Sequence, residues 1–226
     1  MKRTPIDRRV LPGYPAAVER ANMITHIIGA ALGITVLIAA ALISLDTGDA
    51  WALASGSLYG VSMITLYTVS SVYHGLSESR AGHAKRVMQV IDHCTIFFLI
   101  AGTYTPILLV ALRPEYPALS WAIFAAEWII SAAAVVFTAI DHKKYAVLSM
   151  VCYILLGWLI VFVLEKVVYT VGKTGFLWLL AGGVSYTAGA ALYVAGRKKP
   201  ALHTVFHCFV VLGSALQAVC VLRFVM

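Results

Sequence analysis

Charged side chains are scarce in this 226-residue chain, which carries only 10 acidic and 17 basic residues, 12% of the total. Hydrophobic residues make up 61% of the chain, and its mean hydropathy is +0.89. A soluble domain holds about 25% charged residues, because polar groups must cover its surface. The composition therefore excludes an ordinary soluble fold and predicts a membrane protein with several spans.

Cysteine is also rare, and its positions follow no paired spacing. The four cysteines all fall inside apolar runs, at Cys94, Cys152, Cys208 and Cys220. A disulfide framework needs cysteines that loops can bring together in an oxidising compartment. We therefore expect these residues to pack as small apolar side chains.

Signals for cleavage, flexible linkers, low-complexity tracts and internal repeats are missing as well. The first apolar run is too long for the core of a signal peptide, so we expect it to remain as a membrane helix. The expected organisation is a single domain over residues 1–226, in which residues 1–20 form a basic cytoplasmic tail.

Seven apolar runs take up most of the chain. Each is close to the roughly 20 residues that an α-helix needs to cross about 30 Å of hydrocarbon. The runs are residues 24–45, 51–72, 90–112, 119–140, 145–164, 176–195 and 202–225. The sequence thus predicts an all-α membrane protein, a seven-transmembrane helix bundle.

Small residues in the first two spans occur at the spacing that lets helix backbones approach. Gly29 with Gly33, and Gly56 with Gly60, each form a G-x-x-x-G motif, which supports close helix pairs in membranes. Pro106, in the third span, lacks a backbone donor and predicts a kink.

Basic residues gather in alternate connections between these runs. Thirteen of the 17 lie in the first 20 residues or in three later connections: Lys2, Arg3, Arg8, Arg9, Arg20, Arg80, Lys85, Arg86, Lys143, Lys144, Arg197, Lys198 and Lys199. This bias predicts a cytoplasmic N-terminus and an outside C-terminus, in a multi-pass protein of the plasma (inner) membrane. Anionic lipid headgroups are the expected partners of these charges, and no nucleic acid is needed to explain them.

Polar groups inside the spans stand out, since a carboxylate at mid-membrane costs about 2.5 to 3.5 kcal/mol. They are His26, Ser70, His74, Asp92, His93, Glu127, His203 and His207. In the orientation given above, all of them except Glu127 lie within a few turns of the cytoplasmic face. The sequence therefore predicts one polar cluster at this depth.

A metal site explains this cluster best. His203 and His207 are four residues apart, so on a helix they share one face and can bind one ion. The pair alone is a weak motif, but His74 at the same depth completes the three-imidazole set of a catalytic zinc, with one position open. Asp92 is expected to bind zinc through a water and to deprotonate that water. Ser70 is expected to donate a hydrogen bond to a developing oxyanion or to the bound water.

The other titratable residues have less specific expectations. Glu19 and His26 are candidates to support the cluster from the first span, and His93 to support it or to pack. Glu127 is expected to be protonated and to form a hydrogen bond between helices. His83 and His142 fall in predicted loops, where solvation is the default.

Motifs along nearly the whole chain match one family. They are Glu19 with Asn22, Thr25 and His26; S-S-V-Y-H at 70–74; Asp92 and His93; A-G-T-Y-T-P at 101–106; G-G-V-S-Y at 182–186; and H-T-V-F-H at 203–207. In these motifs the chain resembles the haemolysin III group of the progestin and adipoQ receptor (PAQR) family. The resemblance implies seven helices and a zinc site near the cytoplasmic face, with the ligands His74, His203 and His207, and with Asp92 and Ser70 beside them. Gln217 departs from the family, since bacterial members often carry a histidine shortly after the pair Gly213 and Ser214.

Three functions are compatible with these features. The leading hypothesis is a zinc-dependent hydrolase that acts on an amide or ester bond of a membrane lipid or fatty-acid-like ligand in lipid homeostasis, because relatives in the wider superfamily resemble ceramidases. The alternative is a membrane receptor or sensor in which zinc only joins helices. A haemolysin-type pore ranks third, since the spans lack the polar stripe of an aqueous channel. The substrate and the oligomeric state stay open.

Overall fold

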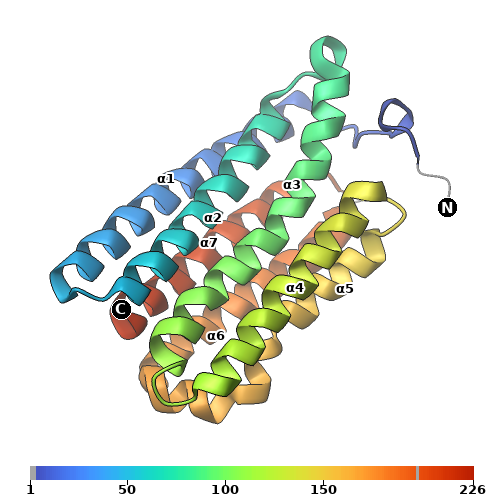
Figure 1. The fold of residues 1–226 in the computed structure, drawn as a ribbon. Coiled ribbons are helices and arrows are strands. Elements are labelled where there is room, and N and C mark those ends of the chain that lie inside the picture. Colours follow the sequence, from blue (N-terminus) through green and yellow to red (C-terminus); the bar gives the residue numbers. More distant parts are fainter. Residues whose placement is uncertain (1–3, 197–198) are drawn as a thin grey trace.

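The structure is a computed structural model that describes residues 4–196 and 199–226, and in these two ranges it has helices and no strand. Figure 1 shows long helices lying side by side in one bundle. The helices are α1 (Ala16–Thr47), α2 (Ala50–Gly75), α3 (Glu78–Pro106), α4 (Pro117–Asp141), α5 (Ala146–Gly157), α6 (Leu164–Gly196) and α7 (Ala201–Cys220). Shorter segments are η1 (Ile6–Arg8), η2 (Ile107–Leu112), η3 (Leu159–Val163) and η4 (Val221–Val225). Four of the basic residues counted above, Lys2, Arg3, Arg197 and Lys198, lie outside the described residues.

Six helical stretches are long and apolar enough to cross a membrane, as a multi-pass membrane protein requires. One of them, Ala146–Gly196, has 51 residues and would be about 77 Å long if straight, more than twice the hydrocarbon thickness. It is interrupted at Gly172, whose φ of 72° and ψ of 164° are not helical. Figure 1 shows the chain reversing direction between α5 and α6 at the end of the bundle, so this stretch holds both the fifth and the sixth apolar runs.

The first two helices pack closely along their glycines. A Cβ atom on Gly29 would lie 2.4 Å from the Tyr67 ring, and one on Gly60 would lie 2.7 Å from the Cα atom of Leu37. Neither distance is possible for a real side chain, so only glycine permits this approach. The close contact expected from the G-x-x-x-G motifs is confirmed.

Pro106 changes the form of α3. The helix passes there into the wider π-helical turns of η2, because proline leaves a carbonyl of the preceding turn without its usual donor. Just before this point, the Tyr104 hydroxyl donates to the Gly157 carbonyl at 3.2 Å and accepts from the Ile160 amide at 2.9 Å. The distortion expected near Pro106 is therefore present, and Tyr104 joins α3 to the junction between α5 and η3.

The start of α3 differs from the sequence expectation. Arg80, Lys85 and Arg86 were expected in a loop, but they lie in the first turns of this helix. The side chain of Lys85 is only 4% exposed, so this residue is not free to contact lipid headgroups. Helix α3 begins at Glu78, almost immediately after α2 ends at Gly75, so the predicted loop is reduced to a short turn.

The N-terminal segment before α1 lies against the end of α4. The guanidinium of Arg9 is 2% exposed and donates to the carbonyl of Ile140 at 2.8 Å, which satisfies a free carbonyl at a helix C-terminus. Arg9 also contacts Nδ1 of His142 at 3.4 Å. The expected solvation of His142 is therefore wrong: Arg9 and the N-terminal segment bury it.

Candidate metal centre

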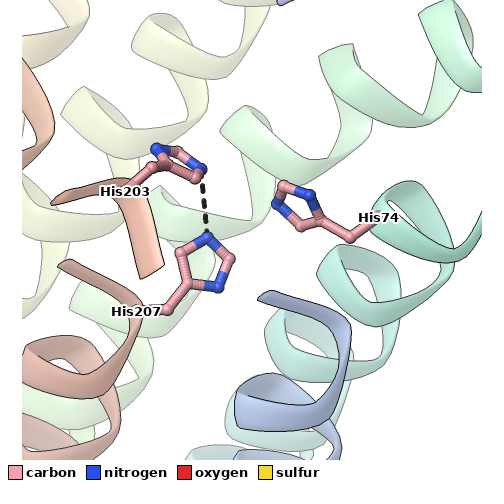
Figure 2. A group of neighbouring side chains, drawn as sticks. All are labelled: His74, His203 and His207. Carbon is pink, nitrogen blue, oxygen red and sulfur yellow. Dashed lines mark hydrogen bonds between the residues drawn. The ribbon is translucent and has the colours of Figure 1, made fainter. Parts of the chain in front are cut away.

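Three histidines meet at one end of the bundle. His74 comes from the last turn of α2, and His203 and His207 come from the first two turns of α7. One ring nitrogen from each residue lies within 4.8 Å of the other two, and Figure 2 shows the three rings facing a common centre. All three side chains are buried. The grouping predicted from the sequence is confirmed, and these residues are close enough to hold a metal ion.

The three rings present the same nitrogen to this centre. The Nε2 atoms of His203 and His207 lie 3.1 Å apart, close to the roughly 3.3 Å that two nitrogens at 2.0 to 2.1 Å from a tetrahedral ion would have. The opposite nitrogen of His74, Nδ1, contacts Oε2 of Glu19 at 2.5 Å, which leaves Nε2 free. A set of three neutral nitrogens fits zinc better than magnesium or calcium.

Glu19 holds His74 in this orientation and is itself held by a buried lysine. Its other oxygen, Oε1, accepts a hydrogen bond from Nζ of Lys85 at 2.6 Å, and Lys85 also donates to the carbonyl of Leu76 at 2.8 Å. Carboxylates that fix metal-binding histidines in this way raise the basicity of the ligand. The supporting role expected for Glu19 agrees with this geometry, whereas Lys85 was missed. Lys85, Gln89 and Asp92 are four and three residues apart and so share one helical face. This spacing could have indicated that Lys85 turns toward the site.

Asn22, one turn after Glu19, joins α1 to α7. Its side-chain oxygen accepts a hydrogen bond from the hydroxyl of Thr204 at 2.6 Å, and its amide nitrogen lies 3.5 Å from Nδ1 of His74. Thr204 follows His203 directly, so this contact fixes the start of α7. Helix α1 therefore supports both helices that carry the three histidines.

Asp92 and Ser70 face the same cavity as His203 and His207. The Asp92 carboxylate lies within hydrogen-bonding reach of the Ser70 hydroxyl. It is not one of the converging ligand groups found among the described residues. The structure thus brings both residues beside the histidines without assigning their roles.

The remaining polar residues of the spans are His93 and His26, which lie near the three histidines, and Glu127 in α4. His93 lines the cavity, and its Nδ1 donates to the carbonyl of Gln89 at 2.8 Å. His26 stacks on His207 with ring centroids 3.8 Å apart. Glu127 is fully buried in α4, yet neither of its oxygens has a hydrogen-bond partner among the described residues. The expected hydrogen bond between helices is therefore wrong for Glu127: the hydroxyl of its neighbour Tyr104 is bonded to Gly157 and Ile160 instead.

A cavity of about 930 Å³ extends from the histidines into the bundle, with mostly apolar walls from α3, α5, α6 and α7. It reaches Gln217 on α7, ten residues or about 15 Å beyond His207. Its wall also includes Val147 and Val151 of α5 and Val194 of α6, which are 78%, 47% and 53% exposed on the outside of the bundle. The cavity is therefore open sideways between α5 and α6.

The N-terminal segment covers the histidine end of this cavity. Pro12, Gly13 and Tyr14 line it there, and the ring of Tyr14 stacks on His203 with centroids 4.8 Å apart.

Burial raises the pKa of Tyr14 to about 12, so its hydroxyl keeps its proton. Burial lowers the pKa of His142 to about 4, with smaller contributions from His93 and Arg9. Both rings are therefore neutral at pH 7. The sequence offered no signal for this cover.

Comparison with known proteins gives consistent matches over nearly the full length. A family model described as Haemolysin-III related matches residues 15–218. Hemolysin-3 of Bacillus cereus is 36% identical over 208 residues, which cover 92% of each chain. The Hemolysin-3 homolog of Bacillus subtilis (strain 168) is 34% identical over 204 residues, 90% of this chain and 92% of that one. The human monocyte to macrophage differentiation factor is 28% identical over 208 residues, 90% of this chain and 83% of its own.

Proposed function

The chain belongs to the haemolysin III-related group of the PAQR family, and from this we propose that it is a zinc-dependent hydrolase of membrane lipids. One observation carries the proposal: three buried histidines converge beside a carboxylate at the end of a large apolar cavity. The cavity has the size of a pocket for a lipid-like ligand, and the polar groups gather where its headgroup would lie. The bond to be cut is an amide or an ester.

Zinc is the metal that suits this donor set. His74, His203 and His207 would hold it, and the bound ion would supply Lewis acidity toward a carbonyl oxygen and toward water. Glu19 accepts the Nδ1 proton of His74 and so keeps the Nε2 lone pair directed at the ion. Lys85 neutralises the charge of Glu19.

Asp92 is the residue that would move the proton. Its carboxylate would take a proton from the attacking water and later return it to the leaving group, and Ser70, in the same cavity wall, would donate a hydrogen bond to the carboxylate. The apolar cavity binds the acyl chain and excludes bulk water. The opening between α5 and α6 gives a lipid a path from the bilayer to this site.

We also propose that the chain crosses the membrane seven times, with the N-terminus in the cytoplasm. Figure 1 shows the two termini at opposite ends of the bundle, which an odd number of crossings requires. The stretch Ala146–Gly196 supplies two of them, on either side of Gly172. The histidines then lie at the cytoplasmic face, beside the positively charged N-terminal segment.

The test compares the wild type with Asp92→Asn in lipid nanodiscs. Both proteins are expected to hold one zinc per chain by plasma mass spectrometry. Only the wild type is expected to release fatty acid from added amide and ester lipids, and the variant is expected to be about 100-fold slower or more, since it has lost its general base. A wild type that holds zinc and releases no fatty acid from any lipid class would exclude the hydrolase.

The second candidate is a receptor or sensor whose zinc is structural. It is favoured by the contacts of Glu19, which join His74 of α2 to Lys85 of α3 and so tie three helices together. In that case Asp92→Ala retains lipid binding with its associated conformational change, whereas His203→Ala unfolds the bundle. A shift in tryptophan fluorescence on lipid addition, unchanged in Asp92→Ala, would support this candidate over the enzyme.

A further inference from the structure

His26 on α1 is a buried histidine whose two ring nitrogens both lack hydrogen-bond partners among the described residues. The residue is only 4% exposed. An unpaired polar group at such a position is destabilising, so buried polar atoms without partners are rare and call for a ligand or an ordered water. The helices packed around it do not supply either nitrogen with a partner among the described residues.

The neighbours of His26 explain why no side chain serves it. Its ring is stacked on His207 at an interplanar angle of 24°, so the edges that carry its nitrogens do not face that residue. The ring of Tyr67 lies at 80° to it with centroids 5.0 Å apart. The Tyr67 hydroxyl donates instead to the Val210 carbonyl and the Ser214 hydroxyl, at 3.2 and 2.6 Å. The Tyr67 hydroxyl is thus already used, and the stacked ring of His207, whose Nδ1 also lacks a partner among the described residues, presents its face to His26.

His26 also lines the cavity that begins at the histidines. It lies against His207, and His207, Val210 and Gln217 of α7 line the same cavity. A lipid with its reacting carbonyl at the metal centre would place that group beside the His26 ring. A neutral imidazole always has one N–H donor, whichever nitrogen carries the proton.

We propose that His26 is a substrate-binding residue that donates a hydrogen bond to the carbonyl oxygen of an acyl group held beside the three histidines. This inference rests on the proposed function, because it takes the lipid site of the hydrolase as given. Both amides and esters carry the required oxygen. His26 acts as a positioning group here, and it does not bind the metal.

The test uses two substitutions at position 26. His26→Phe keeps a flat ring that can stack on His207 and removes both nitrogens, and His26→Gln keeps a hydrogen-bond donor without the ring. The matched control is His83→Phe, since His83 is an exposed histidine of α3 whose ring contacts the exposed Asp7. Zinc content, thermal unfolding and binding of tritiated N-methyl dodecanamide and methyl dodecanoate are measured in nanodiscs.

His26→Phe is expected to hold zinc at the wild-type ratio and to bind both probes about 10-fold more weakly, while His26→Gln regains part of the affinity and His83→Phe matches the wild type. Loss of zinc from His26→Phe would instead indicate that His26 binds the metal, and this result overturns the proposal. Unchanged probe binding would show that His26 does not contact the acyl group, and it overturns the proposal as well. Weakening confined to the amide would overturn the carbonyl contact. Binding is measured in proteins that also carry Asp92→Asn, in which turnover is expected to be about 100-fold slower or more. A chain that binds the probes in this background, and whose wild type never cleaves them, contradicts the hydrolase alone.

Discussion

At the scale of single residues, the candidate metal centre depends on Glu19 and Lys85, which support His74 but are not expected to bind the metal. The three histidines were predictable because their spacing and their depth in the spans coincide. Lys85 was missed because a lysine in a basic stretch is expected to be solvated, although its spacing places it on one helical face with Gln89 and Asp92. Its burial follows from Glu19, whose charge needs a partner once His74 occupies its other oxygen. Buried charges of this kind are stable only in pairs.

Glu19→Gln tests this arrangement. The substitution keeps the size of the side chain but removes the negative charge that fixes His74 and pairs with Lys85. Zinc affinity is expected to fall by about 10- to 100-fold, as is typical when the partner of a metal-binding histidine is lost. Competition with a fluorescent chelator measures it. Glu165→Gln, at an exposed position of α6, is the control and should bind zinc as the wild type does.

At the scale of helices, the sequence predicted most of the fold, since four of the seven apolar runs lie within a single helix, α1, α2, α4 or α6. The other three runs continue across a change of helix type, from α3 into η2, from α5 through η3, and from α7 into η4. What it did not predict is where helices start, stop or break. Helix α3 begins twelve residues before the apolar run that it contains, and the break in the fifth membrane stretch falls at Gly172. Hydropathy reports burial in lipid, whereas these boundaries depend on local backbone geometry and on contacts such as that of Lys85.

The contact of α1 with α2 can be tested with glycine substitutions. Gly60→Ala would place a Cβ atom 2.7 Å from the backbone of Leu37, so the two helices must separate, at a cost of about 1–3 kcal/mol. Gly183→Ala on α6 meets nothing within 4 Å and should be neutral or stabilising by up to about 1 kcal/mol, because alanine favours helix. Thermal unfolding in one detergent compares them. Equal stability of both variants would contradict the close packing of α1 and α2.

At the scale of the whole molecule, the bundle is closed at one end and open on one side. Residues 4–15 cover the histidine end, anchored by Arg9 at the C-terminus of α4, and the cavity opens between α5 and α6. Neither feature was predictable from hydropathy, because both depend on how helices distant in sequence pack. Asp92 and Ser70 were found from depth alone, whereas Tyr14 and Arg9 lie outside the spans, where that argument does not apply.

Acid is expected to release the N-terminal segment. His142 has a pKa of about 4 in the folded protein, below the roughly 6.5 of a free histidine. Between these values the released state binds a proton that the docked state does not, so docking weakens as the pH falls from about 6.5 to 4 and is unaffected above that range. Hydrogen exchange of residues 4–15 at pH 7 and pH 5 measures this. His142→Asn should remove the pH dependence, and equal protection of the wild type at both pH values would contradict it.

The sideways opening between α5 and α6 also determines which concentration of a ligand, in water or in the membrane, controls its binding to the cavity. A molecule that enters there diffuses within the plane of the membrane, so its dissolved concentration in water is irrelevant to the encounter. The relevant quantity is its mole fraction among the lipids around the protein. Diluting a ligand with inert phospholipid should therefore lower occupancy of the cavity even when the total amount per protein is held constant. For a ligand of this kind, the composition of the surrounding bilayer would set the occupancy of the cavity.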